Sequence, residues 1–300
     1  MSSTLLGIML AGACVFAVTP PPAETPIDPF PSFPKTAIRS APGEHVLTPS
    51  VNWQEDASAQ GAEKITFIFY NAKMNAPGDA RSDVAFTFDG VRNIPNYMIV
   101  PLSPGQKAKA GDVLLTWWQS GSGMQRAYVT DASDPAAPVV RYLDLQYDNP
   151  AKNAKGVPIG QMEERLKPDT FGKLTAEFQP GTAVAVLAGT RWLKATVIAV
   201  SEGQVLTIGF AGKMAVYPQT ACRPVPIVPA VAAGDRVQVP YVGSFVNGVV
   251  KSVDAKIGRV FAEIEWGGEE EGGRRPLRRR DDRPGNLKGG GTVSTCQLAS

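Results

Sequence analysis

The chain has 300 residues, with 30 basic and 28 acidic side chains and a formal net charge of +2. This near balance excludes a general electrostatic attraction to nucleic acids or acidic membranes. The length suits two or three domains. The high content of glycine (30) and proline (26) favours turns, short strands and linkers over long helices.

The N-terminus begins with a hydrophobic segment. Leu5–Val18 is one apolar run, too short to span a bilayer and of the length typical of a signal-peptide core. Small residues at Ala11–Ala13 stand directly before Cys14, which resembles a bacterial lipobox. We expect residues 1–18 to be a signal peptide, with Cys14 lipidated and the protein anchored to a membrane of the cell envelope. Cleavage after Ala13, giving a secreted or periplasmic protein, and a buried core helix are the alternatives.

A proline-rich stretch follows the signal segment. Residues 19–50 show little periodicity, which predicts a stiff, extended tether. Alternating apolar residues at Ile65–Tyr70 and Val84–Phe88 then predict strands within residues 51–104. This region is either a separate β-module or a set of extra strands that completes the domain after it.

The second half of the chain contains a repeat. Gly181–Val200 and Gly234–Val253 align at a constant offset of 53 residues, and their apolar residues alternate as in half-buried strands. Each segment predicts two strands joined by a short loop, with a third strand at Val205–Phe210 or Val260–Trp266. An earlier copy begins at Gly111 and aligns after a two-residue deletion in the loop. A fixed repeat indicates that one structural unit occurs several times.

Units of this size are too small for a sandwich and suit a small, strongly bent barrel. The spacing of Gly181, Val184, Val186, Gly189 and Trp192 resembles the opening of Tudor-like and Agenet-like SH3-fold barrels. The resemblance implies an all-β fold of tandem small SH3-like barrels. The expected barrels cover residues 105–150, residues 179–224 and, with a C-terminal tail, residues 233–300.

Two linkers are expected between these barrels. Residues 151–178 are predicted to be a short helical spacer, because Met162 and Leu166 are four residues apart and Pro168 would end the helix. Residues 225–232 are a second proline-rich linker, which we expect to be semi-rigid.

Aromatic residues near the predicted turns are the best candidates for a binding surface. In Tudor-like domains such rings form a cage for a methylated cation. The resemblance extends to Trp192, Phe210 and Tyr217 in the middle barrel, and to Phe245 and Trp266 in the last. In the earliest copy, adjacent tryptophans must point to opposite faces of a strand, so that Trp118 is a further candidate. The alternative is that all these rings fill or cap small cores.

Catalytic chemistry is not expected. The only histidine, His45, falls in the predicted tether, and the sequence has no metal-binding motif, so we expect no metal and no cofactor. The run Arg274–Arg280 lies between acidic residues that nearly neutralise it, so nucleic acid is not an expected partner. Cys222 and Cys296 are either a disulfide pair or two thiols.

The sequence therefore favours a non-catalytic binding or scaffold protein of the cell envelope that recognises protein or an envelope polymer. The alternatives are a purely structural envelope spacer and an intracellular Tudor-like reader of methylated cations.

Overall fold

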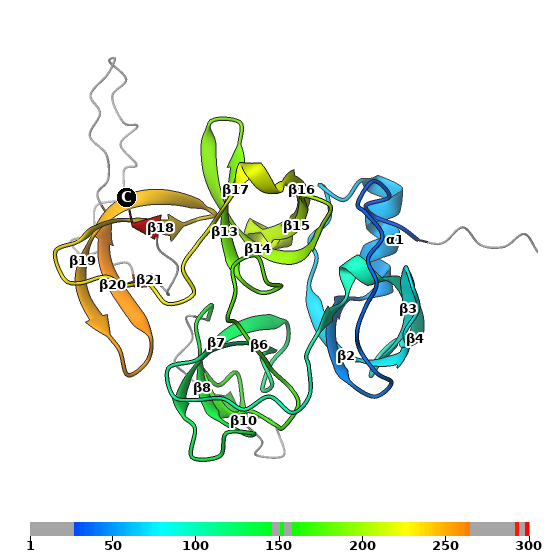
Figure 1. The fold of residues 1–300 in the computed structure, drawn as a ribbon, viewed down its shortest axis with the longest axis horizontal. Helices are drawn as coiled ribbons and strands as arrows, with labels where there is room; N and C mark the ends of the chain where they lie inside the picture. Colours follow the sequence, from blue (N-terminus) through cyan, green and yellow to red (C-terminus); the bar gives the residue numbers. More distant parts are fainter. Residues whose placement is uncertain (1–26, 146–150, 153–157, 265–291, 294–297, 300) are drawn as a thin grey trace, which may run out of the picture.

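The computed structural model describes residues 27–145, 151–152, 158–264, 292–293 and 298–299. Within these ranges the elements are β-strands, apart from one α-helix and three short 3-10 helices. The expected all-β class is therefore confirmed. The strands form four consecutive units with five main strands each, which we call the N-terminal, second, third and C-terminal units, and the second unit also carries a two-stranded hairpin (Figure 1).

The N-terminal unit contains β1 (His45–Pro49), α1 (Val51–Gln60), β2 (Phe69–Ala76), β3 (Arg81–Phe86), β4 (Gly90–Pro95), η1 (Asn96–Met98) and β5 (Val100–Pro101). The second unit contains β6 (Val113–Trp117), β7 (Met124–Asp131), β8 (Val139–Tyr142), a hairpin of β9 (Ala151–Lys152) and β10 (Pro158–Ile159), β11 (Glu163–Arg165) and β12 (Gly172–Lys173). The third unit contains β13 (Ala183–Ala188), β14 (Arg191–Ser201), β15 (Gln204–Gly209), η2 (Phe210–Gly212), β16 (Met214–Pro218), η3 (Gln219–Ala221) and β17 (Cys222–Pro224). The C-terminal unit contains β18 (Arg236–Tyr241), β19 (Ser244–Asp254), β20 (Arg259–Ile264), β21 (Thr292–Val293) and β22 (Leu298–Ala299).

All four units have the same strand order. The first four main strands of each unit pair in sequence as an antiparallel meander, and the fifth strand returns to pair with the first. The spatial order is thus fourth, third, second, first, fifth in every unit. Among the described residues, the fourth and fifth strands do not pair with each other, so no sheet closes into a barrel.

Each unit also begins with the same glycine turn. Gly43, Gly111, Gly181 and Gly234 have φ angles between 88° and 97°, a region that favours glycine. The amide of each glycine donates a hydrogen bond of 2.8 to 3.0 Å to a carbonyl of that unit's second strand. A β-bulge follows that carbonyl in all four units. The N-terminal unit is therefore a fourth copy of the pattern that the sequence predicts for the other three.

The prediction that residues 19–50 form an extended tether is wrong for residues 27–50, the part of this range that the structure describes. Residues 27–50 fold into the N-terminal unit: Phe33 is buried in its core, and β1 is one of its inner strands. His45 packs its ring 5.2 Å from that of Trp117, between centroids. Burial, followed by the nearby charge of Lys73, lowers the pKa of His45, so its imidazole is neutral at pH 7.

The helix expected within the spacer of residues 151–178 is also wrong. Glu163–Arg165 forms β11 and pairs with β8, and β12 completes the sheet of the second unit. Met162 and Leu166 are both buried in the core of that unit. Their spacing of four is even, so it places them on one face of a strand as well as on one face of a helix. The second unit therefore extends beyond the expected boundary at residue 150.

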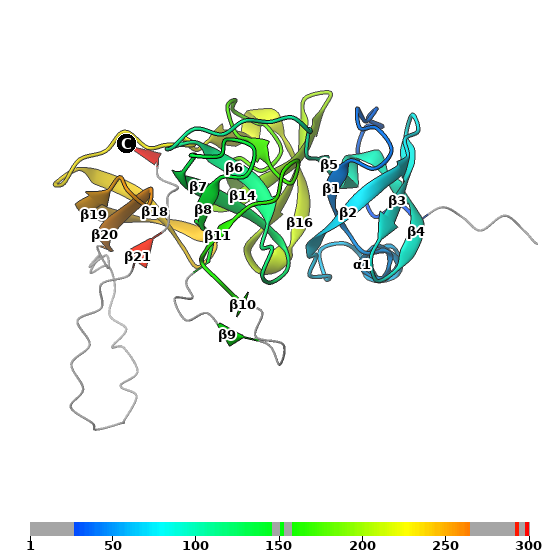
Figure 2. The same ribbon diagram turned by 90° about the horizontal axis from the view of Figure 1, so that it is seen from below.

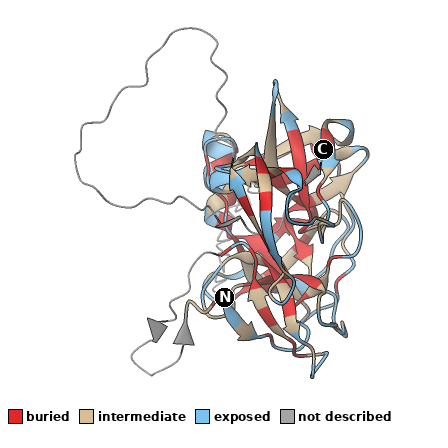
Figure 3. Ribbon diagram, turned by 90° about the vertical axis from the view of Figure 1, so that its left-hand side faces the viewer, coloured by how far each residue is buried: buried red, intermediate tan, exposed pale blue. Residues whose placement is uncertain are grey.

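The four units differ in the kind of contact that they make with one another. Ile198 and Leu206 of the third unit share one hydrophobic core with Phe67 and Phe69 of the N-terminal unit. The C-terminal unit instead reaches its neighbours through hairpin tips, one of which accepts a hydrogen bond of 2.8 Å from the Tyr128 hydroxyl at the Ala255 carbonyl. The N-terminal and C-terminal units lie at opposite ends of the molecule (Figures 1 and 2). Buried residues concentrate in the strands (Figure 3).

None of the helices formed by the described residues is long and apolar enough to cross a membrane. The predicted signal segment and Cys14 lie outside the described residues.

Candidate binding site

The loop between β18 and β19 is a tight turn of two residues, Val242 and Gly243. Their φ angles are 45° and 79°, as in the hairpin turns that match the twist of antiparallel strands. The turn lies against β14, where the Lys194 amide donates to the Gly243 carbonyl at 3.0 Å. A Cβ atom at Gly243 would lie 2.5 Å from Cβ of Phe210, so only glycine permits this approach. The turn thereby fixes the C-terminal unit to the third unit.

Two hollows of about 370 and 250 Å³ flank this turn. We call them together the hairpin groove, because the same turn forms part of both walls. Phe210 and Val242 at its rim are 61% and 65% exposed, although both side chains are apolar. The groove is lined by apolar, aromatic and basic residues, among them Val186, Leu193, Ala215, Phe210, Tyr217, Val242, Arg191, Lys194 and Lys213.

All charged residues that line the hairpin groove are basic. The Lys194 ammonium lies 3.5 Å from Oδ1 of Asp144, and the Lys213 ammonium donates to the Lys64 carbonyl at 2.6 Å. Arg191 is exposed at the rim. Since no carboxylate is among the described lining residues, the groove favours acidic over basic ligands.

The structure brings together two of the three aromatic residues predicted for the middle barrel. Phe210 and Tyr217 both line the hairpin groove. Trp192 lies between Arg191 and Leu193 on β14, and these two neighbours face the groove, so Trp192 points to the other side of the strand. There the Arg223 guanidinium lies 4.4 Å from the centroid of its ring. One face of the Trp192 ring is thus already covered by a cation of the same chain.

The remaining aromatic candidates have packing roles or lie outside the described residues. Phe245 packs against Ala183 and Val225, where it helps to join the C-terminal unit to the third. Trp118 packs against the second unit's core, and its Nε1 donates to the Gln161 carbonyl at 2.7 Å. Trp266 lies outside the described residues.

A larger cavity lies where the N-terminal, second and third units meet. It has a volume of about 420 Å³, and we call it the junction cavity. Lys194 and Thr196 of β14 line both this cavity and the smaller hollow of the hairpin groove, whereas Leu193 and Ala195 line the groove alone, so the two sites adjoin along one strand. Its size is typical of ligand pockets at domain interfaces.

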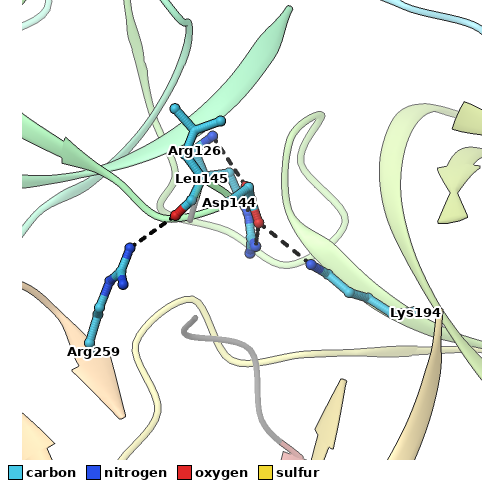
Figure 4. A network of polar contacts seen from close by, with 5 residues as sticks. All are labelled: Arg126, Asp144, Leu145, Lys194 and Arg259. Carbon is cyan, nitrogen blue, oxygen red and sulfur yellow. Dashed lines mark hydrogen bonds and ion pairs between the residues drawn. The ribbon is translucent and has the colours of Figure 1, made fainter. Parts of the chain in front are cut away.

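An ion network crosses this junction (Figure 4). The Asp144 carboxylate accepts a hydrogen bond of 2.9 Å from Nε of Arg126 and pairs with Lys194 of the neighbouring unit. Burial would raise the pKa of Asp144, but the charges of Arg126 and Lys194 and the hydrogen bonds from Arg126 outweigh it and hold the pKa well below its ordinary value. Arg259 of the C-terminal unit donates to the Leu145 carbonyl at 3.1 Å. This network therefore joins three units through residues that the sequence alone does not relate.

The cysteines give no metal or nucleophilic site in the described part of the chain. Cys222 is buried, its thiol lies 3.5 Å from the Pro218 carbonyl, and burial raises the pKa of the thiol. Cys296 lies outside the described residues, so the disulfide with Cys222 and the two thiols both stay open as alternatives. No cluster of three or more metal-ligating side chains occurs among the residues that were placed.

The two hollows contain residues that the sequence did not indicate. Val242 and Lys194 belong to a turn and a strand from different units, and neither carries a motif. The one local sequence signal is the Val-Gly dipeptide at residues 242 and 243, since a two-residue loop ending in glycine predicts a tight hairpin. No protein-family model matches this chain, and a search of curated proteins also finds no match.

Proposed function

We propose that the protein is a non-catalytic binding protein of the cell envelope, built from tandem SH3-like units, and that the hairpin groove is its recognition surface. The groove would hold an extended segment of a partner protein or an envelope polymer that carries acidic groups. One observation carries the proposal: Phe210 and Val242 expose apolar side chains together, beside a groove whose charged lining residues are all basic.

Exposed apolar side chains support this proposal because their burial by a ligand is favourable. An apolar surface rimmed by polar groups is typical of interaction sites. Arg191 places a guanidinium group at the rim of the hairpin groove, and Phe210 places an aromatic ring there. Arginine and aromatic residues are frequent in binding hot spots. The basic residues would orient an acidic ligand and disfavour a basic one.

The strand order supports the SH3-like interpretation of the units. A meander whose fifth strand returns to the first is compatible with a small, bent barrel. In the N-terminal and third units a 3-10 helix precedes that fifth strand, as η1 and η3. Such folds host many functions, so the groove and not the fold carries the functional argument.

The geometry disfavours the alternative of a methyl-cation reader. Its cage would need Trp192 beside Phe210 and Tyr217, but Trp192 stacks with Arg223 instead. A groove lined by basic residues would also repel a cationic ligand. A structural envelope spacer is the remaining alternative, and it predicts that the groove binds nothing.

The first experiment compares two exposed phenylalanines. The full chain would be tested against purified envelope polymer and against arrayed peptides graded from acidic to basic. We expect wild type to prefer acidic ligands that carry an aromatic or aliphatic group. Phe210→Ala should weaken that binding by about tenfold or more, as for a hot-spot residue.

The matched control is Phe88→Ala, because Phe88 is 62% exposed but lies in the N-terminal unit, away from the groove. It should bind as wild type does. Equal losses in both variants would contradict the groove as the site. Absence of binding by wild type to polymer and to every peptide would favour the structural spacer.

A further inference from the structure

The lining of the junction cavity includes apolar side chains from three different units. Phe67 and Ile68 come from the N-terminal unit, Leu115 and Met124 from the second, and Ile208 from the third. Ile68 is 37% exposed although it lies beside this cavity. Apolar surface in a pocket at a domain interface is favourable for a ligand with an apolar part.

Three charged residues of the ion network, Arg126, Asp144 and Lys194, also line the cavity. Arg126 is committed to Asp144, because its guanidinium contacts both carboxylate oxygens at 2.5 and 2.9 Å and its side chain is only 6% exposed. Oδ2 of Asp144 also lies 3.4 Å from the Arg126 amide. The acceptor positions of Asp144 are therefore largely occupied from the side of Arg126.

Lys194 is bound more loosely. Its ammonium lies 3.5 Å from Oδ1 of Asp144, beyond ordinary hydrogen-bond distance, and its side chain is 27% exposed. An ammonium has three donors, so it has capacity to donate to a ligand anion. The three charged groups sum to one positive charge, which favours an anion over a cation beside them in the cavity.

We propose that the junction cavity binds a small amphipathic carboxylate, with its apolar part against Ile68 and Met124 and its anionic group beside Lys194. This site adjoins the hairpin groove and shares Lys194 with it, but the proposal does not depend on the function proposed for that groove. A ligand there would contact three units at once and would stabilise their arrangement by binding the folded chain.

The test uses three eight-carbon probes that differ in charge: octanoate, octanol and octylammonium. Each is titrated into the full chain with ¹³C-labelled isoleucine and methionine methyl groups. We expect octanoate to shift the methyl signals of Ile68, Met124 and Ile208 in a saturable way. Octylammonium should bind more weakly than octanol, because the net charge at the polar end is positive.

Lys194→Gln removes the proposed anion contact and should weaken octanoate about tenfold while leaving octanol unchanged. Ile68→Asp, at a partly exposed position that lines only this cavity, should abolish octanoate binding and favour octylammonium; Ile68→Asn is its neutral control. Phe210→Ala should leave octanoate binding unchanged, which separates this site from the groove.

Equal binding of octanoate and octylammonium by wild type would overturn the proposal. So would shifts that do not saturate, or octanoate binding that survives in Ile68→Asp. In those cases the cavity is a solvent-filled gap between packed units.

Discussion

Val242 holds a β-branched side chain in a left-handed backbone conformation, with φ of 45°. Such a conformation is uncommon for any residue with a side chain and is a clear outlier for valine, at a cost of about 1 to 3 kcal/mol. The third unit has a comparable turn at Glu202, with φ of 48°, but glutamate is not branched at Cβ. Val242 is the only β-branched residue among the described non-glycine residues with positive φ, and its apolar side chain, 65% exposed, lies at the rim of the hairpin groove.

This strain leads to a prediction at Val242. Val242→Asn places at this position the residue that such turns prefer, so it should raise the free energy of unfolding by about 1 kcal/mol. It should also weaken ligand binding in the groove several-fold, because the apolar side chain at the rim is lost. Urea unfolding and a binding titration measure the two effects.

Glu202→Asn is the matched control for this variant. It changes a two-residue turn between β14 and β15 of the third unit, relieves less strain and lies away from the groove, so its stability gain should be smaller and its binding unchanged. A loss of stability in Val242→Asn would show that the valine side chain has a packing role and that strain is not its main effect.

The outer faces of the equivalent strands differ in the third and C-terminal units. The bulge after Val197 in β14 recurs after Val250 in β19, so Ile198 and Lys251 occupy the same place. Ile198 is 1% exposed because the N-terminal unit covers it. The Lys251 side chain is 57% exposed and pairs with Glu263 across the strands. Whether the outer face of each strand carries an apolar or a charged residue thus follows from whether another unit packs on that face.

Exchanging these two residue types tests that explanation. Ile198→Lys would place an ammonium against the core that contains Phe67, and should lower the free energy of unfolding by about 3 kcal/mol or more. Lys251→Ile loses only an exposed ion pair and should change stability by less than about 1 kcal/mol. Thermal unfolding of both variants gives the comparison. Similar stabilities would mean that the N-terminal and third units do not share a core in solution.

The sequence predicted the elements that depend on local pattern. The constant offset between Gly181 and Gly234 located the strands of the last two units, and the strands expected after Gly111 lie close to β6, β7 and β8. The N-terminal copy was missed because α1 separates its first two strands and breaks the repeat. Phe210 and Tyr217 do lie together, but the contact between Trp192 and Arg223 depends on the return of the fifth strand. The junction cavity exists only because three units pack together, and no local sequence pattern predicts that packing.

At the scale of the whole molecule, the folded part begins closer to the N-terminus than the sequence indicated. Phe33 is buried, and Tyr97 donates a hydrogen bond from its hydroxyl to the Asp28 carboxylate. Between Cys14 and residue 27, the covalent chain can extend over at most about 45 Å. If Cys14 carries lipid, the four units are therefore held near the membrane, at a distance comparable with the thickness of the bilayer.

The lipid anchor can be tested by substituting one cysteine at a time in the native host. The wild-type chain should fractionate with membranes and have a mature mass that corresponds to an acylated N-terminus at Cys14. Cys14→Ser removes the acceptor thiol, so the protein should leave the membrane fraction or remain unprocessed. Cys222→Ser changes a buried cysteine of the third unit and should keep both the acylated mass and the membrane association. An unmodified chain in the soluble fraction of wild type would contradict the envelope assignment, because the hairpin groove would then face intracellular partners.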